Sequence, residues 1–406
     1  MKDYYDNIII GGGIIGLSVA KEIIKKEYGS SVLLIEKESA LGLHASGRNS
    51  GVLHSGIYYP DGSEKAKHCH NGSTDMLHFC LDNDIPSKKT GKIILPASDK
   101  DDGGFNMLLS RASSRGNNVE FLDRQQLREL EPFANSAMGK AIYLPNTIVV
   151  NSTLVINKLY EILCSNSVEF KFNSKITFAD PEKSIVTLKG DKIKYGKLYN
   201  CSGQNIDKVA KQFSASNQYS MIPIKGTYYK LKDNSNIVIN HLIYPVPDLN
   251  VPFLGIHTLN TIQEETYFGP SAMPVLGREQ YKYLDSINSN EAINIVRNLG
   301  MLYMKDIDGF RKYANNEVKN FGKNGFIKSV RKLIPSLTNH DIEKSEKVGI
   351  RAQLINNKSL KFEMDFLIEK QDNVVHVLNA VSPAFTCSFS LAKSILEYSN
   401  LTPQNL

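Results

Sequence analysis

The sequence predicts a mixed α/β fold, an α+β arrangement in which a nucleotide-binding unit is joined to a domain of antiparallel strands. Two observations support this prediction. Near the N-terminus, an apolar run at residues 8–10 leads into Gly-Gly-Gly-Ile-Ile-Gly at residues 11–16, and a helical pattern follows at residues 17–26. Between residues 221 and 268, alternating or apolar runs are punctuated by prolines, which is typical of an antiparallel sheet.

The glycine motif has the form G-x-G-x-x-G, which alone is weak evidence for a nucleotide site. Here a second apolar run, residues 32–35, follows the helix and leads into Glu36. The order strand, glycine turn, helix, strand and acid is that of a Rossmann-like unit. In such a unit Gly11 permits the tight turn, Gly13 lets a pyrophosphate approach the backbone, and Gly16 lets the helix pack closely against the strand.

The helix after this motif would offer free backbone N–H groups to the pyrophosphate. Glu36, twenty residues after Gly16, can accept hydrogen bonds from a ribose diol. The competing interpretation is a glycine-rich turn in an ordinary βαβ unit. The order of the features favours a dinucleotide site.

The chain has 406 residues, of which 41% are hydrophobic and 22% charged, a composition typical of globular proteins with two or more domains. No apolar run approaches the roughly 18 residues of a membrane-spanning helix, so we expect a soluble protein. The formal charge of +6 comes from scattered lysines rather than one basic block, which argues against nucleic-acid binding. A small anionic substrate, or a loose peripheral contact with a membrane surface, fits this charge better.

The five cysteines are odd in number, far apart and without a C-x-x-C motif, which argues against a disulfide framework or a zinc site. They are typical of reduced thiols in the cytoplasm. The first strand begins within ten residues of Met1, so we expect no signal or transit peptide. His68, Cys69 and His70 would be spread around a helix, so we expect no metal site. The prediction is a cytoplasmic protein, with a peripheral position on the inner face of the membrane left open.

Residues 46–60 are rich in small side chains and hydroxyls, which would let the backbone run close to a cofactor. This segment resembles the family of FAD-dependent oxidoreductases typified by D-amino-acid oxidase and glycerol-3-phosphate dehydrogenase. Within it, the resemblance to L-2-hydroxyglutarate dehydrogenase/oxidase is closer and covers most of the chain. Its motifs are Asn-Ser-Gly-Val-Leu-His-Ser-Gly-Ile-Tyr-Tyr (residues 49–59), Lys-Ala-Lys (65–67) with Cys69, Gly-Lys-Ile-Ile (91–94), Ile-Tyr-Pro-Val-Pro-Asp (243–248), Phe-Leu-Gly-Ile-His (253–257), Gly-Ile-Arg-Ala-Gln (349–353) and Ser-Pro-Ala (382–384).

The remaining elements follow from local patterns in chain order. Helices are expected at residues 63–83, 105–115, 124–131 and 154–164, over the charged stretch 289–332, and at 388–398. Strands are expected at residues 91–95, 141–150 (a pair), 168–172, 197–201, 221–231, 237–246, 266–268 and 374–378.

The resemblance implies FAD as the cofactor and a discontinuous FAD-binding domain, residues 1–90, 141–215 and 345–406. Residues 91–140 and 216–344 would then form the substrate-binding domain. The N-terminus of the last helix would face the flavin and stabilise negative charge on its reduced form. The residues expected to contact FAD are Gly11, Gly13, Ile15, Gly16, Glu36, Lys37, Ser46, Asn49, Ser50, Gly51, Ser202, Gly203, Ser382, Pro383, Ala384 and Thr386.

Two positions depart from the family's pattern. Arg48 stands where the family usually has histidine. Residues 148–152 read Ile-Val-Val-Asn-Ser, where the family usually has Gly-Ile-Val-Asp-Tyr. Both departures concern the substrate rather than the fold.

The resemblance implies oxidation of L-2-hydroxyglutarate to 2-oxoglutarate, with hydride transfer to FAD and passage of electrons to a quinone or oxygen. Removal of the hydroxyl proton needs a base, and we predict His54 or His257 because imidazole titrates near neutral pH. His54, which lies in the flavin-side motif, ranks slightly higher. Arg351 is expected to bind a substrate carboxylate through two parallel hydrogen bonds. Lys225 and Tyr244 are weaker candidates for substrate contacts.

Each of these residues also has a structural interpretation. Either histidine could be structural or could orient the flavin, and Arg351 could form an ion pair. The alternative function is a related FAD-dependent enzyme acting on glycerol 3-phosphate, an amino acid or another small 2-hydroxy acid. A flavoprotein that uses FAD only structurally or as a redox sensor is disfavoured, because a sensor needs no carboxylate clamp.

Overall fold

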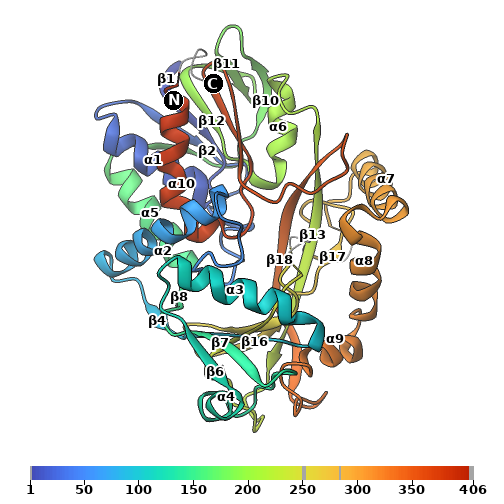
Figure 1. Cartoon of the computed structure of the whole chain (residues 1–406). Coiled ribbons are helices and arrows are strands. Elements are labelled where there is room, and N and C mark those ends of the chain that lie inside the picture. The colour runs from blue at the N-terminus through green and yellow to red at the C-terminus, as the bar shows by residue number, and fades with distance from the viewer. Residues whose placement is uncertain (1, 249–252, 283–284, 402–406) are drawn as a thin grey trace.

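The chain folds into two parts that meet at the glycine turn (Figure 1). The computed structural model describes residues 2–248, 253–282 and 285–401. One part is a sheet covered by helices, which includes both the first strand and the last helix. The other consists of mainly antiparallel sheets flanked by helices, in which one pair of strands, residues 242–245 and 92–95, is parallel (Figure 1). This architecture confirms the predicted mixed α/β fold class.

The first part is built on an eight-stranded sheet with the order β10-β11-β12-β1-β2-β9, to which β20 and β19 are added next to β12. Parallel pairing joins β1 to β2 and β12, β2 to β9, and β12 to β20. The strands of this sheet are β1 (Tyr4–Ile10), β2 (Val32–Ile35), β9 (Glu169–Lys171), β10 (Ile176–Asp180), β11 (Ile185–Leu188), β12 (Asp191–Asn200), β19 (Leu367–Gln371) and β20 (Val374–Asn379).

Helices cover both faces of this sheet. The larger layer packs on one face through a single apolar core, to which β1, β2 and β20 contribute their buried side chains. Its helices are α1 (Ile14–Lys26), α2 (Glu64–Asp82), α5 (Ser152–Ser165) and α10 (Ala384–Ser399). A short helix, α6 (Ile206–Gln212), contacts β10, β12 and β20. Because parallel strands are buried on both faces, β1 and β2 read as continuous apolar runs in the sequence.

The second part is organised by the antiparallel pair β13 (Tyr219–Leu231) and β18 (Ile342–Asn356), which stay paired from Tyr219 and Asn356 to Leu231 and Ile342. The other strands of this sheet are β15 (His257–Asn260), β16 (Thr266–Gly269) and β17 (Met273–Pro274). A four-stranded sheet contains β14 (Leu242–Pro245), β5 (Lys92–Leu95), β7 (Lys140–Leu144) and β6 (Glu120–Asp123), and a three-stranded sheet contains β3 (Val52–Leu53), β8 (Ile148–Val150) and β4 (Ser87–Lys89).

Helices flank these sheets, and the charged stretch from residue 289 forms three of them rather than one. The helices are α3 (Asp102–Ser114), α4 (Arg124–Leu130), α7 (Ser289–Lys305), α8 (Phe310–Lys319) and α9 (Lys323–Val330), with 3₁₀ turns at Asp99–Asp101, Gly203–Asn205 and Ile307–Gly309. The left-handed backbone at Asp306 and Gly309 separates α7 from α8.

The division of the chain into domains stays a prediction. Two pairings bear on its boundaries. β7 pairs with β5 and β6, so residues 140–144 lie in the same sheet as residues 92–95. β18 pairs with β13 along its whole length, so residues 345–356 lie beside the predicted substrate-binding segment. Boundaries placed after β7 and after β18 would keep each sheet within one domain.

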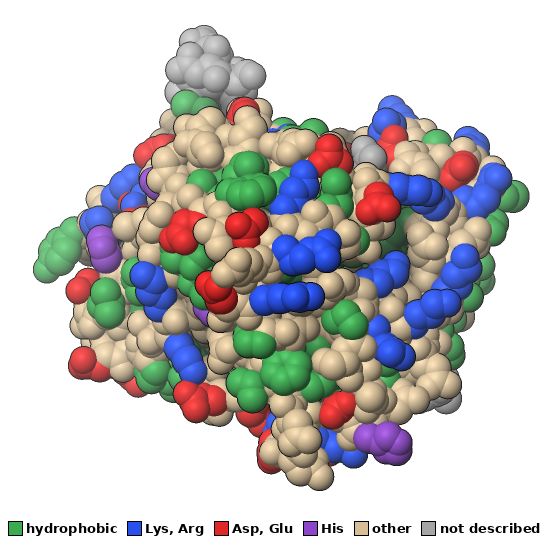
Figure 2. Space-filling view, turned by 60° about the horizontal axis from the view of Figure 1, so that its bottom comes forward, with side chains coloured by type: hydrophobic (Ala, Val, Ile, Leu, Met, Phe, Trp, Pro, Cys, Tyr) green, Lys and Arg blue, Asp and Glu red, His purple; other side chains and the backbone are tan. Residues whose placement is uncertain are grey.

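The surface carries both charged and apolar side chains. In Figure 2, Lys and Arg side chains are spread over the visible face and are densest on the right, the side on which α7, α8 and α9 lie in Figure 1. Within the described part of the chain, every helix falls short of the length or apolar character that a membrane span requires.

Candidate active site

A cavity of about 940 Å³ lies where the two parts of the chain meet. Its walls come from the β1–α1 turn, residues 42–54, the turn after β12, the middle of β18, and the turn that leads into α10. These segments are far apart in the sequence. The parallel pairing of β1, β2, β12 and β20 brings the ends of these strands, and the turns that follow them, to one edge of the sheet.

The glycine turn is packed too closely for side chains. Gly11 has φ +108°, and a Cβ atom there would lie 2.5 Å from the carbonyl oxygen of Cys201. A Cβ atom on Gly16 would lie 2.0 Å from the carbonyl oxygen of Gly11. Gly13 is the N-cap of α1, makes no side-chain cap, and lines the cavity. The start of α1 therefore presents bare backbone to the cavity, as binding of a pyrophosphate requires.

Two side chains at the edge of this turn have fixed orientations. The Glu36 carboxylate accepts hydrogen bonds from the backbone N–H groups of Gly12 (2.7 Å) and Glu38 (2.9 Å). Two lone-pair sites remain on this buried carboxylate, so it can still accept hydrogen bonds from a ribose diol. The Ser46 hydroxyl accepts the N–H of Ile14 at 2.9 Å and closes the first turn of α1.

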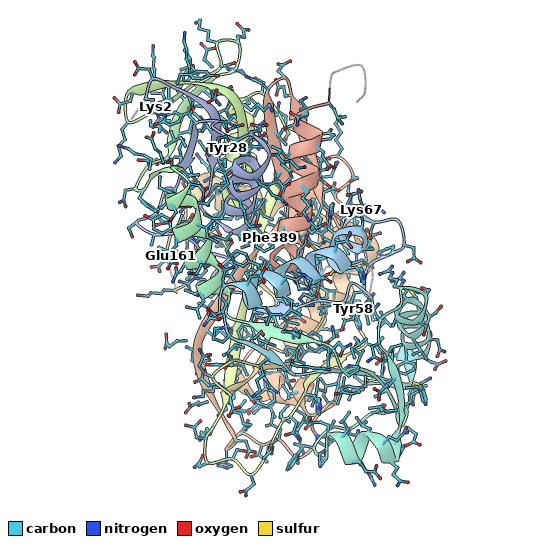
Figure 3. All side chains as sticks on the ribbon, turned by 90° about the vertical axis from the view of Figure 1, so that its left-hand side faces the viewer. Lys2, Tyr28, Tyr58, Lys67, Glu161 and Phe389 are labelled. Atoms are coloured by element: carbon cyan, nitrogen blue, oxygen red, sulfur yellow. The ribbon has the colours of Figure 1, made fainter. Side chains whose placement is uncertain are left out.

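The turn into α10 forms another part of the wall. Ser382, Pro383, Ala384 and Thr386 all line the cavity. The Thr386 hydroxyl donates to the carbonyl oxygen of Val52 (3.2 Å) and accepts the backbone N–H of His54 (3.2 Å). Further along α10, Phe389 packs edge-on against Phe79 of α2, with 5.1 Å between ring centroids (Figure 3). These contacts hold the N-terminus of α10 against the cavity.

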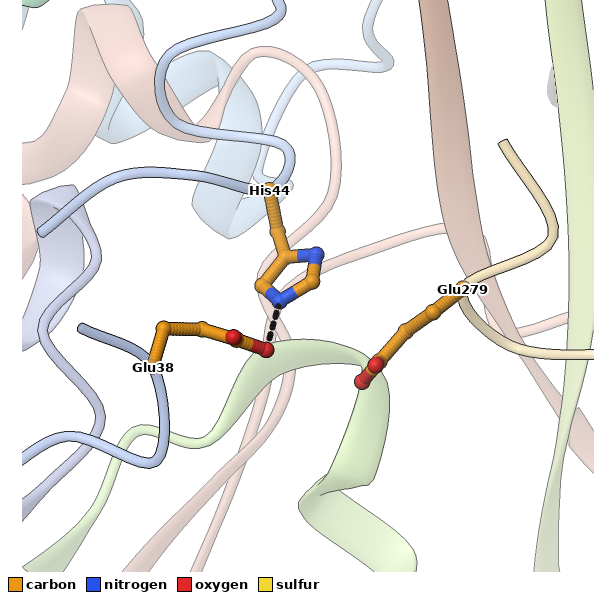
Figure 4. Close-up of side chains that lie close together, drawn as sticks. All are labelled: Glu38, His44 and Glu279. Atoms are coloured by element: carbon orange, nitrogen blue, oxygen red, sulfur yellow. Dashed lines mark hydrogen bonds and ion pairs between the residues drawn. The ribbon is translucent and has the colours of Figure 1, made fainter. Parts of the chain in front are cut away.

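Glu38, His44 and Glu279 lie together at the edge of the cavity (Figure 4). Among the residues that the structure describes, only these three could share a metal ion, since their ligand atoms lie within 4.8 Å of one another. However, the Lys37 ammonium occupies this cluster. It forms ion pairs with Glu38 and, at 2.7 Å, with Glu279, and its hydrogen bond holds the pKa of Glu38 below its usual range. The lysine already supplies the positive charge that a metal ion would bring.

The two predicted bases, His54 and His257, line the cavity, and each is about 8% exposed. The His257 ring stacks on Tyr244, with 3.9 Å between centroids and 20° between planes. Its Nδ1 lies 2.8 Å from the carbonyl oxygen of Gly255, a partner that can only accept, so Nδ1 carries the proton and Nε2 the lone pair. His54 Nδ1 is buried and has no hydrogen-bond partner among the described residues.

Both histidines are neutral at pH 7. Burial lowers the pKa of His54 to about 3, and the charges of Lys92 and Arg351 add to this effect. Burial also lowers the pKa of His257 to about 4, again with contributions from Lys92 and Arg351, although the bond to Gly255 opposes the shift. A neutral imidazole is the form that can accept a proton.

Arg351 lies near the middle of β18, paired with Ile224 of β13, and it lines the cavity. Its guanidinium lies 5.4 Å from the centroid of the Phe253 ring. Burial lowers its pKa, but an arginine remains protonated at any physiological pH. A partly buried guanidinium in a cavity wall is suited to bind a carboxylate.

Most predicted site residues line the cavity. Three do not. Gly16 and Gly51 lie where neighbouring backbone leaves no room for a side chain. Gly51 has φ +69°, and a Cβ atom there would lie 2.1 Å from the carbonyl oxygen of Val150. Lys225 points elsewhere, because its ammonium donates to the backbone carbonyl of Tyr281 at 2.6 Å. Its position gives no support to a role in substrate binding. The predicted residues that line the cavity are Gly11, Gly13, Ile15, Glu36, Lys37, Ser46, Asn49, Ser50, His54, Ser202, Gly203, Tyr244, His257, Arg351, Ser382, Pro383, Ala384 and Thr386.

The two departures from the family's pattern have local explanations. Arg48 stacks over the Tyr281 ring at 4.2 Å from its centroid, and its Nε donates to the carbonyl oxygen of Leu43 at 2.8 Å. Asn151 caps α5, because its side-chain oxygen accepts the backbone N–H groups of Thr153 and Leu154. Arg48 therefore lines the cavity, whereas Asn151 stabilises the N-terminus of α5.

Several cavity residues were not predicted from the sequence. Tyr228 lies on β13, and Tyr313 and Glu317 lie on α8, yet all three line the cavity. Glu317 accepts the backbone N–H of Ala272 at 3.1 Å, and burial raises the pKa of its carboxyl group. The only local signal in α8 is that Phe310 and Tyr313 are three residues apart, a spacing that an ordinary apolar helix face shares.

The profile of the family described as "FAD dependent oxidoreductase" matches residues 6–398. The chain belongs to this family. It is 32% identical to L-2-hydroxyglutarate dehydrogenase of Escherichia coli (strain K12), over 97% of this chain and 92% of that protein. It is 33% identical to the enzyme of the same name from Indibacter alkaliphilus, over 96% and 98%. The mitochondrial L-2-hydroxyglutarate dehydrogenase of Dictyostelium discoideum is 30% identical, over 100% and 94%.

Solved structures of flavin-containing and other oxidases share the fold. An L-α-glycerophosphate oxidase from Mycoplasma pneumoniae with FAD bound has a TM-score of 0.76 at 19% identity, covering 99% of this chain and 96% of that one. A glycine oxidase from Geobacillus kaustophilus has a TM-score of 0.72 at 15% identity, with the same coverage. The family's cofactor fits this chain, because the glycine turn, the fixed Glu36 carboxylate and the α10 N-terminus all border one cavity.

The close approach at Gly13 predicts that a side chain there weakens FAD binding. A Cβ atom on Gly13 would lie 3.0 Å from the Ser46 hydroxyl oxygen, and a branched side chain would extend into the cavity. We expect Gly13→Val to raise the dissociation constant for FAD at least about tenfold, roughly 1.4 kcal/mol. Fluorescence titration of the FAD-free protein measures this. Gly300→Val is the matched control, because Gly300 faces open space in α7. Equal affinity in the Gly13 variant and the control would contradict the assignment.

Proposed function

We propose that this protein oxidises L-2-hydroxyglutarate to 2-oxoglutarate, with FAD as the hydride acceptor. One observation carries the proposal. A cavity that begins at a glycine turn suited to a dinucleotide also contains a partly buried arginine and two neutral histidines. The relatives that match nearly the whole chain at about 30% identity bear the name of this enzyme.

Different residues of the cavity would perform different steps of the reaction. The Arg351 guanidinium would bind a carboxylate of the substrate and hold the carbon that bears the hydroxyl group toward the cofactor. A histidine would accept the hydroxyl proton. The fixed tautomer of His257 favours this residue, because its Nε2 lone pair is available while Nδ1 is held by Gly255. FAD supplies the site that accepts the hydride.

The alternative substrates are glycerol 3-phosphate, an amino acid and other small 2-hydroxy acids. The solved structures of similar fold include a glycerophosphate oxidase and a glycine oxidase, but their identity to this chain is below 20% and supports the fold alone. The positive charge of the partly buried Arg351 favours a carboxylate or phosphate over a neutral substrate.

We further propose that the electrons pass to a quinone or to oxygen, and that the protein works in the cytoplasm in peripheral contact with the inner face of the membrane. Support for the contact comes from α7, α8 and the residues just after α8. Five apolar side chains there are more than half exposed: Ile293, Val296, Met304, Val318 and Phe321. Exposed cations accompany them: Arg297, Lys305, Arg311, Lys312 and Lys319. We call these ten residues the α7–α8 surface. Exposed apolar groups among cations fit an anionic bilayer surface.

The proposed substrate predicts a stereospecific reaction of the bound flavin. Under anaerobic conditions, L-2-hydroxyglutarate should bleach the flavin absorbance near 450 nm, and the D isomer should not. Arg351→Met should keep FAD but reduce the apparent second-order rate constant for bleaching about 10- to 100-fold, because charge-assisted hydrogen bonds are lost. Bleaching by glycerol 3-phosphate or an amino acid, without bleaching by L-2-hydroxyglutarate, would show that L-2-hydroxyglutarate is not the substrate and that the bleaching compound is.

The fixed tautomer of His257 predicts which histidine is the base. His257→Gln should slow anaerobic flavin reduction about 10²- to 10⁴-fold, the range expected for loss of a general base. His54→Gln, which is the comparison variant, should slow it less. A rate of reduction that is unchanged in either variant removes that histidine from the proton transfer.

The α7–α8 surface predicts salt-sensitive binding to anionic vesicles. The protein should sediment with vesicles that contain phosphatidylserine and not with purely zwitterionic ones, and added salt should release it. The double variant Arg297→Glu with Lys305→Glu should lose this binding. The control carries Lys183→Glu and Lys192→Glu, two exposed lysines at the β11 hairpins. Equal sedimentation of the two double variants would show that the protein does not bind vesicles through the α7–α8 surface.

A further inference from the structure

Lys92 is a buried lysine without a hydrogen-bond acceptor. It lies on β5, between β14 and β7, and its residue exposure is 0%. Its Nζ makes no hydrogen bond to any described residue, and no described carboxylate forms an ion pair with it. Lysine is almost never fully buried unless it is paired. A core position in a sheet would accept a leucine or methionine, so this charge needs an explanation.

Aromatic rings surround the ammonium of Lys92. Its Nζ lies 4.9 Å from the centroid of Tyr58 and 5.2 Å from that of Tyr244, within the range of cation–π attraction. Figure 3 places Tyr58 just below α2, where the helices meet the sheets beneath them. Tyr244 in turn stacks on His257. Lys92 does not line the cavity, whereas Tyr244 and His257 do, so its charge acts on the cavity through this wall.

The charge is present at neutral pH and is not compensated nearby. Burial lowers the pKa of Lys92 to about 8, which leaves the side chain mostly protonated at pH 7. The titratable groups that face it are Tyr58, Tyr244, His54, His257 and the Cys69 thiol. The two tyrosines and the two histidines are uncharged at pH 7, because burial raises the pKa of each tyrosine and lowers that of each histidine. Arg351, the other cation of this wall, acts on the same two histidines.

We propose that Lys92 is a positioning residue of this enzyme, whose buried charge acts together with Arg351 to keep His54 and His257 unprotonated and to draw a dicarboxylate substrate into the cavity. The inference rests on the proposed function for the identity of the dicarboxylate. The effect on the histidines does not depend on that identity. Like charges oppose protonation of a neighbouring imidazole, and the same potential favours an anion.

A purely structural role makes a different prediction. If Lys92 only filled the core, an apolar side chain of similar length would replace it without effect on the cavity. Because an isolated buried charge destabilises a protein, Lys92→Met should raise thermal stability under either interpretation. Stability therefore does not separate the two roles, but the protonation of the histidines and the binding of anions do.

The test uses Lys92→Met and, as a second variant in case the first does not fold, Lys92→Gln. Lys65→Met is the matched control. Lys65 is also buried, lies over the rings of Tyr59 and Phe366, and has a pKa lowered by burial to about 8, yet it does not act on His54 or His257. Histidine ring ¹⁵N chemical shifts of the FAD-loaded protein, followed from pH 8 to 4.5, report protonation. Calorimetric titration with 2-oxoglutarate reports anion binding.

In the wild type and in Lys65→Met, we expect His54 to stay neutral over this pH range and His257 to begin to protonate only near its lower end. In the Lys92 variants, the pKa of at least one of the two histidines should rise by about one unit, and the dissociation constant of 2-oxoglutarate should rise about tenfold. Unchanged histidine shifts and unchanged affinity in both Lys92 variants would overturn the proposal, as would equal effects in Lys65→Met. If the wild type failed to bind 2-oxoglutarate while the histidine pKa rose in the Lys92 variants, the proposed substrate would fail and the electrostatic role of Lys92 would stand.

Discussion

The parallel pairing of β1 with β2 on one side and β12 on the other is the constraint on which the cavity depends. The backbone N–H of Gly11 donates to Ile35 at the end of β2, and the N–H of Cys201 donates to Ile10 at the end of β1. These two bonds fix the glycine turn between Glu36 and the turn after β12. The turn can be this tight only without side chains, because a Cβ atom on Gly11 would meet the carbonyl of Cys201. The shape of the cofactor-binding turn therefore depends on the register of the sheet as much as on the glycine motif.

The second feature that defines the cavity is positive charge in a wall of apolar and aromatic side chains. Arg351 lies by Phe253, and Lys92 lies by Tyr58 and Tyr244. Aromatic faces attract cations but carry no net charge, so they hold these groups without neutralising them. Elsewhere the chain does the opposite: Lys37 is matched by Glu38 and Glu279 at the cavity's edge. Lys37 is therefore neutralised by two carboxylates of the protein, whereas Arg351 and Lys92 place positive charge beside the aromatic rings of the cavity wall.

The sequence predicted the fold class, the family and the local elements around the glycine turn, because those depend on short-range patterns. β2 was predicted at residues 32–35 and is observed as Val32–Ile35. β18 was missed, although Arg351 lies on it. Its residues alternate poorly, and its stability as a strand comes from β13, more than a hundred positions earlier. Lys225 was named for its neighbour Gly226, but its side-chain direction depends on a contact with Tyr281. Lys92 was part of a recognised motif, yet its burial follows from strands that no local pattern pairs with it. The roles of the site residues remain predictions.

The order of the segments around the cavity has a consequence for synthesis of the chain. The glycine turn and Glu36 leave the ribosome first, whereas α10, which closes the cavity, is translated last. At about 5–20 residues per second, the interval between β2 and the end of α10 is roughly 20–70 s. For roughly the first half of that time β1 lacks its β12 neighbour, and for the whole of it the apolar faces of α1 and α2 lack α10, so unpaired strand edges and apolar surface are open to other chains. A nascent chain of this kind should bind chaperones that cover its apolar surface until α10 has been translated.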